Sequence, residues 1–163
     1  MTTIASSPSP LAPVRFVHRE PLLIAGFGDR FTADTTSAIN ALWQEFVPFF
    51  GKIPNQVGRE RYGVSCHPDR SGGFEYIAGV CVDTVDDIAP SLRWVALQAQ
   101  YYAVFEHLGH LSGLGQTYSA IWQQWLPGSG YVAADAPEFE CYHGDYDDDS
   151  DNAVLEIWIP LSR

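Results

Sequence analysis

AIWQQWLP, at residues 120–127, has a close copy in ALWQEFVP, at residues 41–48. The two strings share Ala, Trp, Gln and Pro at matching positions and differ elsewhere only by exchanges between similar side chains. Internal repetition of this density predicts that the chain is built from two equivalent halves, each organised around one copy.

Each copy lies at the end of a predicted amphipathic helix. Hydrophobic residues recur there at the i, i+3, i+4, i+7 spacing of a helix with one buried face. They are Ile39, Leu42, Trp43, Phe46, Val47 and Phe50 in the first helix, and Leu114, Tyr118, Ile121, Trp122 and Trp125 in the second. We interpret the tryptophans as core residues, and we expect Pro48 and Pro127 to end the two helices.

The composition is that of one globular domain without a nucleic-acid-binding surface. The chain has 163 residues, of which 46% are hydrophobic, and this is enough for a substantial core. Its net charge is −11 at pH 7, and its nine Lys and Arg residues are scattered. This charge argues against direct contact with nucleic acid, which needs a basic stripe, and favours the attraction of cations.

The sequence carries no signal of secretion or of membrane insertion. Cys66, Cys81 and Cys141 are odd in number and have no C-x-x-C spacing, so we interpret them as reduced thiols. Residues 1–13 are rich in Ser, Pro and Thr and lack the apolar segment of a signal peptide, which predicts a flexible tail. No apolar run approaches the ~20 residues of a membrane span. We therefore expect a cytoplasmic protein without membrane contact.

The segments around the two helices predict strands in the same order in each half. The first half predicts an extended segment at 14–32 with a break near Pro21, a helix at 35–49, and hairpin strands at 61–66 and 73–82. The second half predicts an extended segment at 93–109, a helix at 112–127, and hairpin strands at 139–143 and 153–161. The predicted fold is therefore α+β: two pseudo-symmetric βαββ repeats, residues 14–82 and 93–161, form one curved antiparallel sheet with both helices on one face.

Several motifs together resemble the gyrase-inhibitor-like family. They are A-V-F from Ala103, Y-x-x-I-W-x-x-W-L-P-x-S-G-Y from Tyr118, P-E-F-E-C-Y from Pro137, L-E-I-W-I-P-L from Leu155 and, in the first half, F-E-Y-I-A-G-V from Phe74. The family is the effector-binding domain at the C-termini of AraC-type and MerR-type multidrug-responsive regulators, and it also occurs as a free-standing protein. The resemblance covers about residues 14–163. No helix-turn-helix precedes Val14, so it implies a free-standing small-molecule-binding protein.

Strand alternation in V-L-E-I-W-I-P-L separates an aliphatic face from a second face that carries Glu156 and Trp158. The aliphatic residues, expected to pack under the helices, are Leu155, Ile157, Ile159 and Leu161. A carboxylate beside an indole on the concave side of a sheet suits a cationic aromatic ligand, because a partly desolvated cation–π contact contributes ~2 kcal/mol. The resemblance implies the same role, since in the multidrug-responsive relatives a Glu four residues before this Pro reads the ligand's charge. The alternative is a solvated Glu on an edge strand.

Five further residues are candidates for the ligand site. Aligning the two halves places Glu75 opposite Glu156 and turns Tyr76 towards the helices; the alternative for Glu75 is a solvated residue near a hairpin turn. Glu140 and Tyr142 share one face of the neighbouring strand, and they join the site if that face is the one that carries Glu156. Otherwise they form a surface pair. Trp94 either lines the same cleft or packs in the core.

The acidic run D-Y-D-D-D-S-D at 145–151 has the spacing of an EF-hand calcium loop, with Glu156 as its twelfth residue. Ser150 stands where the sharp turn needs Gly, and the flanking segments predict strands, so we interpret the run as a solvated hairpin loop. No Cys/His set has zinc spacing, and no G-x-S-x-G elbow occurs. We therefore expect no metal, no cofactor and no nucleophilic catalysis.

Three functions follow as hypotheses. The first is a binding protein for amphipathic, cationic aromatic molecules, which it sequesters or hands to a partner. The second is a hydrolase, because some free-standing members of the family resemble enzymes that open cyclopropane rings in DNA-alkylating natural products. In that case Glu156 or Glu140 would act with Tyr142 or Tyr76 as general acid and base. The third is an inhibitor that binds gyrase, as the family name suggests.

Overall fold

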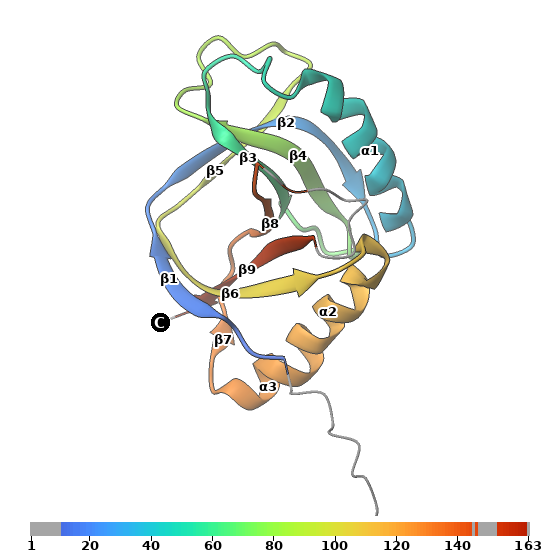
Figure 1. Ribbon diagram of the computed structural model, residues 1–163, viewed down its shortest axis with the longest axis vertical. Coiled ribbons are helices and arrows are strands. Elements are labelled where there is room, and N and C mark those ends of the chain that lie inside the picture. The colour runs from blue at the N-terminus through green and yellow to red at the C-terminus, as the bar shows by residue number, and fades with distance from the viewer. Residues whose placement is uncertain (1–10, 145, 147–152, 163) are drawn as a thin grey trace, which may run out of the picture.

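The computed structural model describes residues 11–144, 146 and 153–162. Within these residues, nine strands form one antiparallel sheet in the order β1-β6-β9-β8-β3-β4-β2-β5, with β7 beside β9 (Figure 1). The first half of the chain supplies β1 (Arg15–Arg19), β2 (Leu22–Phe31), α1 (Ile39–Phe46), β3 (Gln56–Cys66) and β4 (Phe74–Val82). The second supplies β5 (Arg93–Leu97), β6 (Gln100–Leu108), α2 (Leu114–Ala120), α3 (Leu126–Ser129), β7 (Val132–Ala133), β8 (Glu138–Tyr142) and β9 (Val154–Ser162). The predicted α+β fold of two βαββ units is confirmed.

The two halves exchange a short strand at their N-terminal ends. β1 pairs with β6 of the second half, and β5 pairs with β2 of the first half. Each extended segment must therefore bend between its two strands, so that one part pairs within its own half and the other part crosses over. The break near Pro21 was predicted from the sequence. The break at residues 98–99 was not, and the single extended segment predicted at 93–109 is wrong.

The sheet curls so that one of its faces is enclosed. Side chains from strands at both ends of the strand order meet in one cluster: Leu97 from β5 and Trp158 from β9 are buried in it, and the partly buried Val17 from β1 packs against it. These strands come together only if the sheet bends around them. We call this the inner face, and we call the opposite side the helix face, because α1 packs there on β2 and β4 while α2 packs on β6 and β9 (Figure 1).

The helix ends differ from the prediction in the second half. α1 ends at Phe46 and passes into a 3-10 turn, Val47–Phe49, which contains Pro48. After α2, a π-helical segment, Ile121–Trp125, leads into α3, which runs past Pro127 and ends at Gly130 with a φ of +80°. Pro127 closely follows the π-helical segment, where the regular i→i−4 hydrogen bonding of the helix is already interrupted. The predicted helix end at Pro127 is wrong.

The core follows the predicted alternation in β9. The four aliphatic residues predicted for the helix face are all buried there, where they pack against α2 and the π-helical segment; they are Leu155, Ile157, Ile159 and Leu161. Cys66, Cys81 and Cys141 are free thiols, as expected. Across the described ranges, no helix is both long and apolar enough to span a membrane. The aspartates of the acidic run that was interpreted as a solvated hairpin loop, at 145, 147–149 and 151, lie outside the described residues.

Candidate functional site

Glu156 lies on the inner face, as strand alternation predicted, and its carboxylate contacts other side chains of the chain. Its Oε2 atom accepts a hydrogen bond from Arg15 Nη2 at 2.6 Å, and its Oε1 atom accepts one from Trp158 Nε1 at 3.2 Å. His143 Nε2 lies 3.4 Å from the same Oε1. Trp158 is only 4% exposed and stacks on Phe139 with ring centroids 5.2 Å apart. The carboxylate and indole predicted for a ligand therefore contact the chain's own cation and core.

Glu75 has the same surroundings in the first half. It is buried on the inner face, with Oε2 2.7 Å from Arg93 Nη2 and Oε1 2.7 Å from His67 Nδ1. Each of the two glutamates thus contacts one arginine and one histidine. The arginines come from the exchanged strands: Arg93 of the second half reaches Glu75 of the first, and Arg15 of the first half reaches Glu156 of the second.

Glu140 and Tyr142 lie on the helix face, so the condition that would have joined them to Glu156 fails. The register explains this, because Cys141 pairs with Glu156 and the side chains of Glu140 and Tyr142 therefore alternate to the other side. Tyr142 packs in the core between the sheet and α2, and its ring centroid is 5.2 Å from that of Trp43 on α1. The two residues belong to a second, separate group of side chains between the helices.

The centre of this group is the buried carboxylate of Glu140. Its Oε2 atom accepts a hydrogen bond from Tyr76 Oη at 3.0 Å and a longer one from Tyr142 Oη at 3.4 Å. Tyr118 of α2 contributes a third hydroxyl. Glu138, two residues earlier on the same face of β8, adds a second carboxylate. We call these five residues the helix-face cluster: Tyr76, Tyr118, Glu138, Glu140 and Tyr142.

A glycine on β3 makes room for the cluster. Gly63 pairs with Glu140 across the sheet, and a Cβ atom placed there would collide with the hydroxyl of Tyr76 and come within 2.9 Å of Glu140 Oε2. The absence of a side chain at this position therefore allows the phenol and the carboxylate to meet over the strand.

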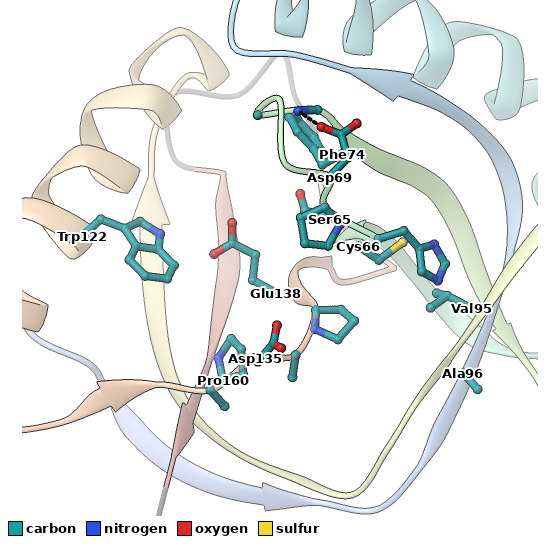
Figure 2. A pocket seen from close by; sticks show the side chains of 17 residues that line it. Ser65, Cys66, Asp69, Phe74, Val95, Ala96, Trp122, Asp135, Glu138 and Pro160 are labelled. Carbon is teal, nitrogen blue, oxygen red and sulfur yellow. Dashed lines mark hydrogen bonds between the residues drawn. The ribbon is translucent and has the colours of Figure 1, made fainter.

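Tryptophans from both helices flank the cluster. Trp43 Nε1 on α1 donates a hydrogen bond to Tyr76 Oη at 3.0 Å, and the indole of Trp122 in the π-helical segment faces Glu138 (Figure 2). The preceding residues, Leu42 and Ile121, are the ones that enter the core. Trp122 is 38% exposed, so its predicted place in the core is wrong. The repeated A-[IL]-W string thus presents one indole to the cluster from each side.

An open pocket of about 590 Å³ adjoins the cluster at Glu138. Figure 2 shows the carboxylate of Glu138 and the indole of Trp122 facing each other across this space, with Cys66 and Val95 on another wall. Trp94 does not line the pocket. It is 47% exposed, because its neighbour Val95 takes the inward position on β5, so Trp94 packs neither in the core nor in this cleft.

Burial raises the pKa of both carboxyl groups of the cluster towards neutral pH. It raises the pKa of Glu138 from 4.5 to about 7, against the opposing hydrogen bond from Trp122. It raises the pKa of Glu140 to about 7 as well; the hydrogen bond from Tyr76 opposes this shift and the negative charge of Glu138 adds to it. Within the described part of the chain, neither carboxylate forms an ion pair with a basic residue, and Glu138 Oε2 has no hydrogen-bond partner.

Sequence reasoning named Tyr76, Glu140 and Tyr142 but missed how they come together, and it missed Tyr118, Glu138 and the role of Trp122. Alternation within P-E-F-E-C-Y was a usable signal for Glu138, because it places Glu138, Glu140 and Tyr142 on one face. The choice between the two faces needed the register of β8 against β9.

The sequence and the fold both have known relatives. A family model described as the GyrI-like small molecule binding domain matches residues 12–162. The transcriptional regulator BrlR of Pseudomonas aeruginosa is 27% identical over 149 residues, which are 90% of this chain and 54% of BrlR. The chain therefore spans about half the length of this curated relative.

Solved structures share the fold at low identity. The structure of SAV2435 bound to tetraphenylphosphonium has a TM-score of 0.75 and 22% identity, and the match covers 91% of this chain and 93% of SAV2435. A hydrolase encoded by lin2189 from Listeria innocua has a TM-score of 0.54 and 11% identity, covering 94% of each chain. At these identities the comparison concerns the fold alone.

Proposed function

The chain belongs to the GyrI-like small-molecule-binding family, and from this premise we propose that it binds an aromatic cation on the helix face at Glu138 and Glu140. The observation that carries the proposal is the buried carboxylate of Glu140 next to the partly buried carboxylate of Glu138, both without a described basic partner, beside a pocket of about 590 Å³. A buried charge without a partner is unfavourable, and a cationic ligand supplies the missing charge.

The aromatic side chains support an aromatic rather than an inorganic cation. Indoles approach the cluster from both helices, and three phenols surround Glu140, so π faces and carboxylates lie together. A cation spread over aromatic rings gains from both kinds of group. Tetraphenylphosphonium, the compound bound to SAV2435, is a cation of this kind and is a suitable probe.

The test compares tetraphenylphosphonium with the neutral triphenylphosphine oxide, measured by tryptophan fluorescence at pH 8. Glu140→Gln keeps the shape and the acceptor for Tyr76, and it should weaken binding of the cation by about ten- to a hundredfold, as expected for a charge-assisted contact. The neutral compound should bind about equally to both proteins.

Glu156→Gln is the matched control, because it removes a buried carboxylate that already contacts Arg15. Its effect on tetraphenylphosphonium should be small. If Glu156→Gln lowers the affinity for tetraphenylphosphonium and Glu140→Gln does not, the ligand binds at the inner face instead. Equal losses of affinity for the charged and the neutral compound would show that neither carboxylate interacts with the charge of the ligand.

A second candidate function is hydrolysis. A carboxyl group with a pKa of about 7, hydrogen-bonded to the hydroxyls of Tyr76 and Tyr142, can give and take a proton near neutral pH. Incubating the protein with a cyclopropane-bearing alkylating natural product tests this role. Turnover lost in Glu140→Gln would support an enzyme, and intact substrate after long incubation would leave binding alone.

A further inference from the structure

A second group of ligating side chains lies outside the helix-face cluster, at the end of the β3–β4 hairpin. One ligand atom each from Cys66, His67 and Glu75 lies within 4.8 Å of the other two. Cys66 and Glu75 are 2% and 3% exposed, whereas His67 is open to solvent. Thiolate, imidazole and carboxylate are the three ligand types that Zn²⁺ takes in proteins. We propose that these three residues bind a divalent thiophilic cation of the Zn²⁺ type.

The two oxygens of Glu75 have different partners, and this suits a metal ligand. Oε1 lies 2.7 Å from His67 Nδ1, and Oε2 lies 2.7 Å from Arg93. A cation replaces the proton between the imidazole and Oε1, while Arg93 stays on Oε2 and holds the carboxylate in place as an outer partner. The thiol of Cys66 gives up its proton to solvent on binding.

The backbone at His67 is held in an unusual conformation. Its φ is +50°, in the left-handed region that residues other than Gly seldom adopt. The following turn is fixed by Asp69, whose Oδ1 accepts hydrogen bonds from the backbone N–H groups of Ser71 and Gly73, both at 2.9 Å. Arg30 Nη2 also donates to the carbonyl of His67 at 3.0 Å. The turn thus directs the imidazole onto Glu75 before any cation arrives, and local strain of this kind is concentrated at functional sites.

A cation can reach this group through the pocket. Cys66 and His67 line it, and Figure 2 shows the sulfur of Cys66 on its wall. Asp135 lines the same space, and its charge favours a cation, whereas the charge of Asp69, which also lines it, is balanced by Arg30 at 2.9 Å. Three protein ligands leave the fourth tetrahedral position for water or a ligand atom from the pocket side.

The second half contains a natural comparison. Cys141, His143 and Glu156 also lie within 4.8 Å of one another, but Glu156 Oε1 already accepts a hydrogen bond from Trp158 at 3.2 Å. None of these three residues lines the pocket. We therefore assign the cation to the first half alone. Sequence spacing did not indicate the site, because the hairpin pairing of Cys66 with Glu75 brings the carboxylate in.

The test uses Co²⁺, because thiolate ligation gives a charge-transfer band that carboxylate or histidine sites do not give. The protein is used without a histidine tag. We expect one thiolate-bound Co²⁺ per chain, displaced by Zn²⁺, in the wild type and in Cys141→Ser. Cys66→Ser should abolish the band. In His67→Asn, whose side chain tolerates the left-handed backbone, Zn²⁺ should bind more than about tenfold more weakly, since even outer partners of metal sites contribute 10–100-fold.

The outcomes separate cleanly. Absence of the band in the wild type, or a band that survives Cys66→Ser and disappears in Cys141→Ser, would overturn the assignment. Because Cys66 is buried, its variant is first checked for folding by circular dichroism. If Cys66→Ser does not fold, His67→Asn carries the test, since His67 is exposed; unchanged Zn²⁺ affinity in that variant would also overturn the proposal. His143→Gln is the control and should bind Zn²⁺ like the wild type.

Discussion

The two faces of one sheet differ in what surrounds their buried or partly buried glutamates. On the inner face, Glu75 and Glu156 each contact an arginine, at 2.7 and 2.6 Å, and a histidine. On the helix face, Glu138 and Glu140 meet only neutral donors among the described residues, namely phenols and an indole. The difference teaches that burial of an acid does not by itself identify a site for an aromatic cation; Glu75, which has its arginine, is proposed above as a metal ligand instead. What matters is whether the fold also supplies the compensating charge.

The source of that charge is the strand exchange. Arg15 and Arg93 lie on β1 and β5, the strands that each half gives to the other, and both face inward. The elements that cover the helix face carry no Lys or Arg anywhere between residues 36 and 49 or between 111 and 129. The carboxylates of the inner face are therefore balanced by the strand exchange. On the helix face, Arg61 of β3 lies over the ring of Tyr142, 5.9 Å from its centroid, and forms no described ion pair with Glu138 or Glu140.

The largest expected effect is the loss of stability when a tryptophan is removed, and it should differ between the two sides of the sheet. Trp158→Ala removes a fully enclosed indole that stacks on Phe139, and it should lower the free energy of unfolding by about 3–5 kcal/mol. Trp122→Ala removes an indole that borders a pocket, so the loss should stay below about 1.5 kcal/mol. Urea unfolding of both variants measures this. Equal losses would mean that the pocket side is packed as tightly as the inner face.

The fold was largely predictable from the sequence, and the site only in part. The repeat of A-[IL]-W with its strand patterns predicted both βαββ units, because hydrophobic spacing reports burial directly. Alternation in β9 placed Glu156 and Trp158 correctly away from the helices. It could not show that Arg15, 141 positions away, donates a hydrogen bond to the Glu156 carboxylate. Nor could it show the π-helical segment that ends with Trp125, since no residue type marks one.

The next effect concerns the pH dependence of stability. The pKa of Glu140 is about 7 in the folded protein and near 4.5 when unfolded, so the folded state binds more protons between these values. The stability linked to neutral Glu140 is thus present below pH 4.5 and is lost as pH rises through 7. Glu140→Gln stays neutral, and at pH 8.5 it should be more stable than the wild type by up to about 3 kcal/mol. At pH 5 the two should differ little.

Thermal unfolding at the two pH values measures this difference, with Glu156→Gln as the control. That variant loses a contact with Arg15 and should gain no stability at pH 8.5. A Glu140→Gln protein that is equally or less stable than the wild type at pH 8.5 would mean that the helix-face carboxylate is compensated after all.

A smaller loss of stability is expected when the arginine that balances the charge of Glu156 on the inner face is removed. Arg15→Met keeps the side-chain length but leaves Glu156 without its arginine, and it should cost about 2 kcal/mol at pH 7. This is less than a fully buried pair loses, because the Arg15 side chain is 44% exposed. In the double variant with Glu156→Gln, most of this loss should disappear, as a double-mutant cycle reports. Additive losses would show that Arg15 acts through its packing on Trp158, 5.5 Å away, and not through charge.

The smallest effect is the pH dependence of cation binding, and it joins the comparison to the proposed function. A cation favours the ionised form of a carboxyl group whose pKa is about 7, so binding should release a proton. If one of the two carboxyl groups must be ionised, its charged fraction rises about tenfold between pH 6 and pH 8, and the affinity for tetraphenylphosphonium should rise by about the same factor. Triphenylphosphine oxide should show no such rise, and Glu140→Gln should flatten it for the cation. Calorimetry in two buffers of different ionisation enthalpy counts the released protons directly. A flat profile in the wild type, with no proton released, would place the cation away from Glu138 and Glu140, beside a carboxylate that is already ionised at pH 6.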